Sequence, residues 1–140
     1  MRKRYGAILT VIAYIVFFFC MEGWGANWKF IGKSSRDDVW EIDTASISRQ
    51  PNNIVRIWAK VTHSRRSVTD FVKERGEKYK DVSYSIELQE YNCTENKLHT
   101  LSGADYSLGG VVINSGNTLE EWKFIVPDSV GDGINKEVCK

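Results

Sequence analysis

The densest group of side chains that could bind a ligand is a cationic segment between His63 and Lys80. Its basic residues outnumber three acidic ones, Asp70, Glu74 and Glu77, which gives a local excess of three positive charges. Such a patch attracts sulfated glycans or acidic protein surfaces, and the attraction weakens as salt screens it. The commoner interpretation, which we favour, is a solvated helix and loop whose charges keep the surface wet. The six candidate binding residues are Arg65, Arg66, Lys73, Arg75, Lys78 and Lys80.

Trp58 is a second candidate contact residue. A strand over Ile54–Thr62 would place it on the same face as Arg56 and Lys60, because successive side chains of a strand point to opposite faces. An exposed tryptophan at this position would be a strong interface anchor. The alternative, which we favour, is that a helix covers this face and buries Trp58.

Residues that could support catalysis or metal binding are scarce. His63 and His99 are isolated, without a companion at zinc-ligand spacing. The segment Asp128–Gly133 resembles a calcium loop only in part, since Val130 stands where a ligating oxygen is needed. No Gly-x-Ser-x-Gly turn is present in the sequence. We therefore expect that the protein binds no cofactor or metal and is not an enzyme. A small periplasmic enzyme would need a cleft that holds titrating groups of shifted pKa.

The N-terminus has the order of a secretory signal peptide. A basic head, Met1–Arg4, precedes an uncharged apolar run, Ala7–Phe19, and a small-residue end. Gly23 and Gly25 provide the small side chains that cleavage needs one and three residues before the cut. We expect cleavage after Gly25, with Ala26 as the second choice. Residues 1–25 are then the signal and residues 26–140 a single exported domain.

Two alternatives stay open for this segment. An uncleaved anchor helix needs about 20 apolar residues, and the run falls short before Glu22. A lipoprotein needs a small residue before its modified cysteine, whereas Cys20 follows three phenylalanines. Cleavage changes the formal net charge from +1 to −1, a balance that argues against nucleic-acid binding. We expect a location in the periplasm or at the cell surface, with no stable membrane span after cleavage.

The cysteine count predicts a disulfide. Cys20 leaves with the signal, so Cys93 and Cys139 remain as a pair in an oxidising compartment. A bond between them would close a long loop and stabilise the domain by about 4 kcal/mol in the chain-entropy model. The alternative is a pair of buried free thiols.

Strand-like runs separated by turn residues organise the exported domain. The clearest strand is Ile54–Thr62, in which Val55, Ile57, Ala59 and Val61 share one apolar face. The other expected strands cover residues 27–33, 39–43, 82–93, 97–106, 111–113 and 119–126.

Two of these strands carry expectations about phase. Within residues 82–93, Ile86 and Leu88 are out of phase with Tyr91, so a bulge near Glu90 would be needed to turn them all inward. Within residues 119–126, apolar side chains fall at alternate positions, namely Trp122, Phe124 and Val126.

Two helices complete the prediction. Ser67–Gly76 begins with a capping-box pattern and ends at a glycine. A final helix follows the cap residues Asp128 and Ser129 and ends near Cys139, which the disulfide would tie to the sheet. The fold class is therefore α+β, with an antiparallel sheet of about six strands and one or two short helices. Edge strands of such a sheet must be covered or paired, so a homodimer is a further expectation.

The order of several features resembles a known family. They are Trp28, Asp43, the segments Trp58–Lys60 and Tyr91–Cys93, Tyr106 with Gly109, Trp122, Pro127, Ser129 and Cys139. The exported chain resembles the bacterial surface-adhesin E family over nearly its whole length. The resemblance implies an antiparallel sheet with a C-terminal helix and a non-enzymatic adhesin that holds a host extracellular-matrix protein or glycan. The alternative function is a periplasmic structural or accessory protein of an envelope complex.

Overall fold

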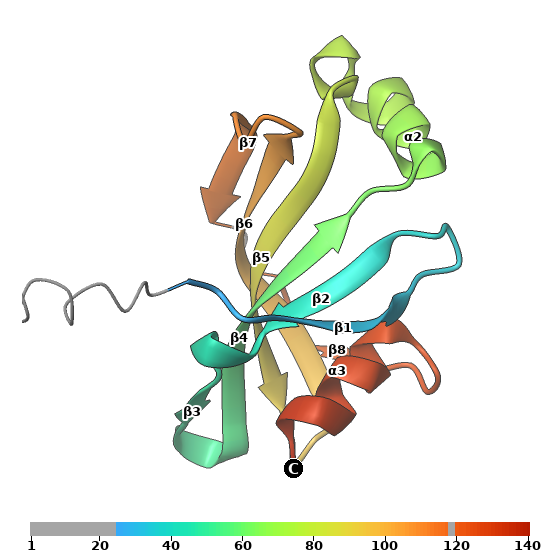
Figure 1. The fold of residues 1–140 in the computed structure, drawn as a ribbon. Helices are drawn as coiled ribbons and strands as arrows, with labels where there is room; N and C mark the ends of the chain where they lie inside the picture. The colour runs from blue at the N-terminus through green and yellow to red at the C-terminus, as the bar shows by residue number, and fades with distance from the viewer. Residues whose placement is uncertain (1–24, 118–119) are drawn as a thin grey trace, which may run out of the picture.

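The computed structural model describes residues 25–117 and 120–140, which form one twisted antiparallel sheet with helices at both ends (Figure 1). The predicted signal peptide lies outside the described residues, apart from Gly25. The strands are β1 (Trp28–Lys33), β2 (Val39–Asp43), β3 (Ser48–Gln50), β4 (Ile54–Thr62), β5 (Val82–Asn92), β6 (Lys97–Ser107), β7 (Val112–Asn117) and β8 (Lys123–Phe124).

The sheet order is β1-β2-β4-β5-β6-β7, with β3 paired to β4 and β8 paired to β6. The predicted α+β class is confirmed, with eight strands in place of about six. The strand without a counterpart in the prediction is β3, which has three residues and is too short to produce a periodic pattern.

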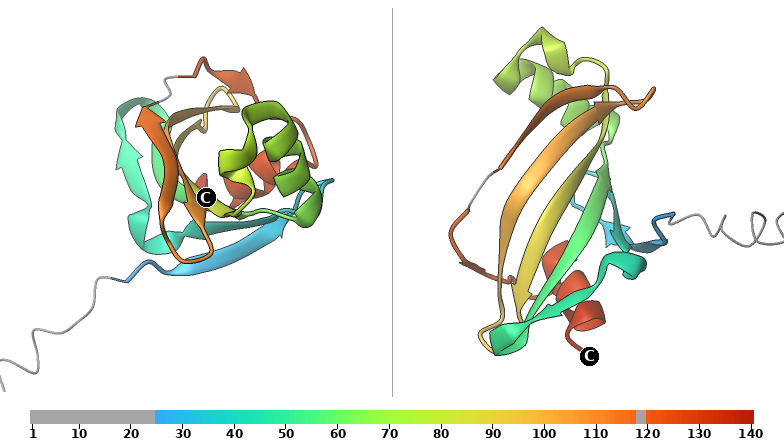
Figure 2. Two further views of the ribbon diagram at one scale, coloured as in Figure 1. Left: turned by 90° about the horizontal axis from the view of Figure 1, so that it is seen from above. Right: turned by 90° about the vertical axis from the view of Figure 1, so that its left-hand side faces the viewer.

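Within residues 25–117 and 120–140, two α-helices and three 3-10 helices accompany the strands. Figure 2 shows the helices at opposite ends of the sheet, and within the described residues neither is long and apolar enough to cross a membrane. The elements are η1 (Thr44–Ser46), η2 (Pro51–Asn53), α2 (Arg65–Arg75), η3 (Glu77–Tyr79) and α3 (Val130–Val138).

The predicted apolar face of β4 is the centre of the core. Val55, Ile57, Ala59 and Val61 are all buried, with exposed fractions of 4% or less. They define what we call the inner face of the sheet. Tyr91 of β5 and Ile42 of β2 lie in the same buried cluster, together with Ile125 and the α3 residues Ile134 and Val138.

The predicted bulge near Glu90 is wrong. Pairing of β4 with β5 runs without interruption from Thr62 opposite Tyr84 to Ile54 opposite Asn92. The strand phase is therefore constant, and it places Ile86 and Leu88 on the outer face and Ser85, Glu87 and Gln89 on the inner face with Tyr91. The extra residue sits in β6 instead, where Leu101 has no partner between Ser102 and Thr100.

The strand expected over residues 119–126 is much shorter in the structure. β8 spans only Lys123–Phe124, and Phe124 and Val126 are exposed while Ile125 is buried. The Ile125 amide donates to the Asn96 carbonyl over 3.0 Å, which turns the Ile125 side chain into the core. The alternate positions in this segment thus face outward.

Helix α3 confirms the predicted C-terminal helix. Its N-cap is Ser129, whose hydroxyl accepts from the Asp132 amide. A side chain at Gly131 would meet Leu98 of β6 at 2.9 Å, so glycine allows α3 to approach the sheet closely. Helix propensity alone predicts only that Gly131 destabilises the helix.

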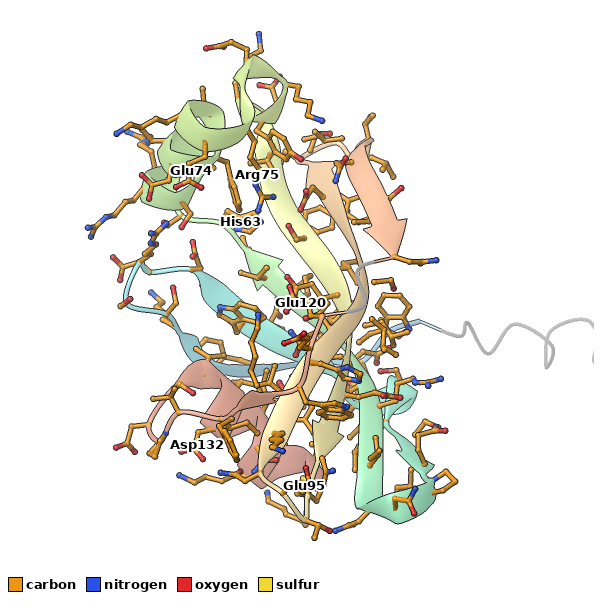
Figure 3. The ribbon with its side chains drawn as sticks, turned by 180° about the vertical axis from the view of Figure 1, so that it is seen from behind. His63, Glu74, Arg75, Glu95, Glu120 and Asp132 are labelled. Carbon is orange, nitrogen blue, oxygen red and sulfur yellow. A yellow bond between two sulfur atoms is a disulfide. The ribbon has the colours of Figure 1, made fainter. Side chains whose placement is uncertain are left out.

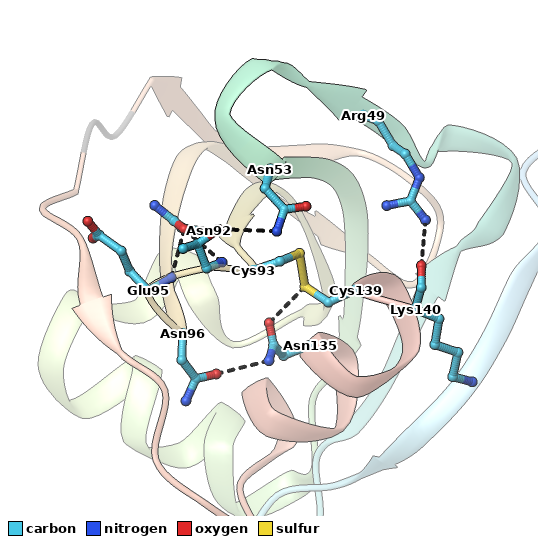
Figure 4. Close-up of a disulfide and its surroundings, with 10 residues drawn as sticks. Arg49, Asn53, Asn92, Cys93, Glu95, Asn96, Asn135, Cys139 and Lys140 are labelled. Atoms are coloured by element: carbon cyan, nitrogen blue, oxygen red, sulfur yellow. Dashed lines mark hydrogen bonds between the residues drawn. A yellow bond between two sulfur atoms is a disulfide. The ribbon is translucent and has the colours of Figure 1, made fainter.

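The predicted disulfide between Cys93 and Cys139 is present (Figure 4). It joins the end of β5 to the end of α3. Nearby, the Asn135 amide donates to Asn96 over 2.9 Å, and Arg49 donates to the Lys140 carbonyl over 3.0 Å. The C-terminus is thereby attached to both β3 and the β5–β6 turn.

Candidate functional site: the α2 end of the sheet

Helix α2 begins three residues before the predicted position. Its N-cap is Ser64, whose hydroxyl accepts from the Ser67 amide, and it ends at Gly76, which has a φ of 95°. Ser67 does not cap the helix. It is buried, and its hydroxyl donates to a carboxylate oxygen of Asp38 over 2.8 Å. A capping-box pattern in sequence therefore identified the helix but not its first residue.

Asp38 holds the start of α2 against the sheet. Its other carboxylate oxygen accepts from the Ser64 amide over 2.7 Å. Burial alone would raise the pKa of Asp38, but the hydrogen bonds from Ser64 and Ser67 outweigh that effect and hold the pKa below its usual value. Asp38 is thus an ionised anchor for the helix.

Aromatic side chains hold the other turns of α2. Phe71 meets His63 edge-on at 4.8 Å and stacks on the buried Tyr79 at 5.9 Å between ring centroids. Arg75 lies over the Phe71 ring at 4.7 Å, in cation–π geometry. Because one side of α2 is fixed by these contacts, its remaining side is presented to solvent.

All six candidate cations are exposed at this end of the sheet: Arg65, Arg66, Lys73, Arg75, Lys78 and Lys80. Within residues 25–117 and 120–140, Arg75 alone among them has a carboxylate within 4.0 Å, that of Asp105 at 3.9 Å. Asp70, the acidic residue in the middle of α2, is paired with Arg36 of a different segment at 2.8 Å. The excess positive charge of this end is therefore not cancelled locally.

Trp58 lies on the outer face, whereas α2 and α3 lie on the inner side. Its neighbour Ala59 is in the core beneath α3, so Trp58 points the opposite way. The expectation that a helix buries it is wrong, because Trp58 is 38% exposed and no described helix covers this face. It borders a shallow groove of about 340 Å³ with Tyr106 and Gly103. The structure does not bring Trp58 together with the cations of α2.

A polar cavity of about 340 Å³ lies on the inner face between α2 and α3. Carboxylates from three segments line it: Glu87 of β5, Asp105 of β6 and Glu120 after β7. Figure 3 shows Arg75 at the α2 end and Glu120 nearer the middle of the sheet. Burial raises the pKa of Glu87, a hydrogen bond from Gln89 opposes the rise, and Glu120 and Asp105 add to it.

A chain of hydrogen bonds closes the α2 side of this cavity. The Ser85 hydroxyl donates to Asp105 over 2.5 Å, and Nε2 of His63 lies 2.7 Å from the same hydroxyl oxygen. Because the Ser85 proton is directed to Asp105, Nε2 of His63 must be the donor. Burial lowers the pKa of His63, against the attraction of Asp38 and Asp105. This order differs from a Ser-His nucleophile, in which the hydroxyl donates to the imidazole.

The remaining metal and calcium candidates are occupied by structural contacts. His99 is buried, its Nε2 donates to the Glu90 carboxylate over 2.8 Å, and its ring stacks on Trp122 at 3.8 Å. Asp132 in the calcium-like segment pairs with Lys136 at 2.7 Å. In the part of the chain that the structure describes, no three His, Cys, Asp or Glu side chains are grouped to hold a metal ion.

Sequence reasoning missed the cavity because its residues are far apart in the chain. One signal was present: Ser85, Glu87 and Gln89 alternate in a strand that lies in the middle of the sheet. Polar residues on the inner face of a central strand violate the usual pattern, and such violations concentrate at functional or strained positions.

The structure defines a small α+β domain. It has an apolar cluster and a disulfide at the α3 end and exposed cationic side chains at the α2 end. The chain belongs to the surface-adhesin protein E family, whose model matches residues 28–140. None of the curated proteins compared with the sequence matches it.

Solved structures of Haemophilus influenzae protein E have a similar fold. The selenomethionine form is 18% identical with a TM-score of 0.55, covering 79% of this chain and 84% of that one. A second structure of that protein is 16% identical with a TM-score of 0.55, covering 80% of this chain and 83% of that one. At this level of identity the likeness concerns the fold.

Proposed function

We propose that the protein is an exported, non-enzymatic adhesin that binds a partner outside the inner membrane through the α2 end. The partner is a host extracellular-matrix protein or glycan that presents negative charge. Cleavage of residues 1–25 would release the adhesin domain. Membership of the surface-adhesin protein E family supports the class of function.

The observation that carries the proposal is the set of exposed cations on α2 and η3. Five of the six have no carboxylate within 4.0 Å among the described residues, so their charge is available to a ligand. Such a surface accelerates encounter with an acidic partner and makes binding sensitive to salt. These cations are exposed, and the buried cluster with Ile134 and the disulfide lies at the α3 end, so this surface can change without loss of the fold.

The test is a solid-phase panel of matrix proteins and heparin, with the protein applied over a range of concentrations and salt. We expect saturable binding to at least one member of the panel, weaker at high salt. The variant Arg65→Glu/Lys80→Glu should bind about tenfold less rapidly at low salt. A control, Lys123→Glu/Lys140→Glu, makes the same charge change at exposed lysines of the α3 end.

Absence of binding across the whole panel at low salt would contradict adhesion. Equal losses in the two charge-reversal variants would show that net charge, and not the α2 end, determines binding.

A further inference from the structure

The two edges of the sheet are protected very differently. At one edge, β1 carries Lys29 and Lys33, and α3 packs against it with Glu137 2.7 Å from the Lys29 ammonium. At the other edge, β7 pairs only with β6 among the described residues. β7 contains no charged residue and no proline, and five of its six residues are exposed. Sheets normally guard an edge with charge, proline or a covering element, so β7 is open to another strand.

The turn that leads into β7 and the first residue of the strand carry exposed apolar side chains. Leu108 is 87% exposed, Val111 67% and Val112 51%. The turn itself is well formed, with the Ser107 amide donating to the Val111 carbonyl over 2.9 Å. These side chains lie beside the open edge, where an added strand would remove them from water.

Cations of the α2 end lie next to this turn. Arg65 and Lys80 line one surface depression of about 660 Å³ together with Asp81, Leu108 and Val68, so two cations face one carboxylate there. A ligand seated there meets positive charge and apolar surface together.

The opposite charge lies farther along β7. Gly116 borders the cavity that holds Glu87 and Glu120. The net formal charge of the lining residues is therefore positive near Leu108, where Asp81 opposes two cations, and negative near Gly116, where Arg75 opposes three carboxylates.

We propose that β7 receives an extended segment of the partner protein as an added strand, with acidic and apolar residues of that segment at the α2 end. The inference rests on the proposed function and narrows the partner class from any acidic ligand to a protein. Main-chain hydrogen bonds along β7 supply affinity. Carboxylates beside Arg65 and Lys80, and an apolar side chain against Leu108, supply specificity and direction.

A sulfated glycan fits these observations less well. It would use the cations, but it has neither a main chain to pair with β7 nor an apolar side chain to cover Leu108. An anionic lipid surface would engage the cations and the apolar turn, yet it would leave the hydrogen-bonding groups of β7 in contact with water or headgroups.

The test is hydrogen–deuterium exchange of the full exported protein with three probes: a short peptide that alternates glutamate and valine, heparin, and vesicles containing an anionic phospholipid. We expect the peptide to slow exchange of the amides of residues 112–117. A peptide that alternates lysine and valine should do so far less. Heparin should leave exchange in β7 unchanged.

Two variants separate the parts of the site. Leu108→Asn/Val111→Asn changes exposed side chains only, and it should weaken peptide binding about tenfold while heparin binding stays the same. Arg65→Glu/Lys80→Glu should weaken the binding of both the glutamate–valine peptide and heparin.

Four results would overturn the inference. Peptide binding without protection of β7, or peptide binding unaltered by the Leu108→Asn/Val111→Asn variant, would show that the peptide does not bind as an added strand beside Leu108. Protection of β7 by vesicles alone would assign it to lipid, and protection that grows with protein concentration without any probe would assign it to a second copy of this chain. Failure of the matrix panel would instead refute adhesion, whatever the exchange data show.

Discussion

The two ends of the inner face use the same strands for different purposes. At the α3 end, β4 and β5 contribute Ile57 and Tyr91 to a closed apolar core with Ile134, and a disulfide locks the helix in place. At the α2 end, β5 contributes Ser85 and Glu87 to a polar cavity. The α3 end therefore supplies the apolar cluster and the disulfide that stabilise the fold, whereas the α2 end contains polar and charged groups.

The anchoring of the two helices shows the same contrast. Helix α3 is held by buried aliphatic side chains and a covalent bond. Helix α2 is held by an ionised carboxylate, Asp38, and by the stacking of Phe71 on the buried Tyr79. Changes at α3 should thus lower stability at every pH, whereas the stability that Asp38 gives to α2 should depend on pH.

The largest expected effect comes from removal of the disulfide. Cys93→Ala/Cys139→Ala should lower the free energy of unfolding by about 4 kcal/mol, because the bond restricts a long loop of the unfolded chain. Denaturant unfolding measures the change. A loss below about 1 kcal/mol would show that the apolar packing of α3 suffices without the bond.

Truncation of the α3 core should have the next largest effect. Ile134 is 1% exposed, so Ile134→Ala should reduce the free energy of unfolding by about 3 kcal/mol through lost burial and a residual cavity. Ile86→Ala, on the outer face, is the matched control and should lose less, since Ile86 is only partly buried. Similar losses for both variants would contradict the assignment of the core to the inner face.

Asp38 should make the α2 end sensitive to acid. Its folded pKa lies below its usual value, so the stability it contributes is present above about pH 4 and is lost as the pH falls through the folded pKa. Asp38→Asn should be less stable than the wild type at neutral pH, by about 1–3 kcal/mol. The difference in Tm should shrink in acid. A difference in Tm between the variant and the wild type that does not change with pH would contradict a stabilising role for the Asp38 charge.

Glu87 should show the smallest effect, with the opposite sign. Its folded pKa is raised, so its ionised form disfavours the folded state above that pKa, and the penalty disappears as the pH falls toward its unfolded value. Glu87→Gln keeps the acceptor for Gln89 and removes the repulsion from Glu120 and Asp105. We expect Glu87→Gln to raise the Tm slightly at neutral pH. A fall in Tm would mean that the cavity stabilises the ionised Glu87 carboxylate.

The sequence predicted the stable end far better than the cationic end. Strand β4, helix α3 and the Cys93–Cys139 bond follow from local periodicity, caps and cysteine count, and the structure confirms each of them. The cavity could not be predicted, because Ser85, Asp105 and Glu120 meet only when three segments come together.

The errors in phase have a common cause. On β5, Ile86 and Leu88 suggested an inward face by their apolar character, but strand phase is set by pairing with β4. Trp58 was expected beneath a helix for the same reason, and it lies on an open face. Apolar character alone does not say which face of a two-sided sheet is covered.

The most direct test of adhesion asks whether added protease can reach the α2 end on living cells. Trypsin cleaves after arginine and lysine, and Arg65, Arg66 and Lys73 are exposed on a helix held by few buried contacts. On intact cells, added trypsin should cleave this protein within residues 65–80 before any periplasmic marker is lost. Protection of the protein until the outer membrane is opened would confine it to the periplasm and contradict its function as a surface adhesin.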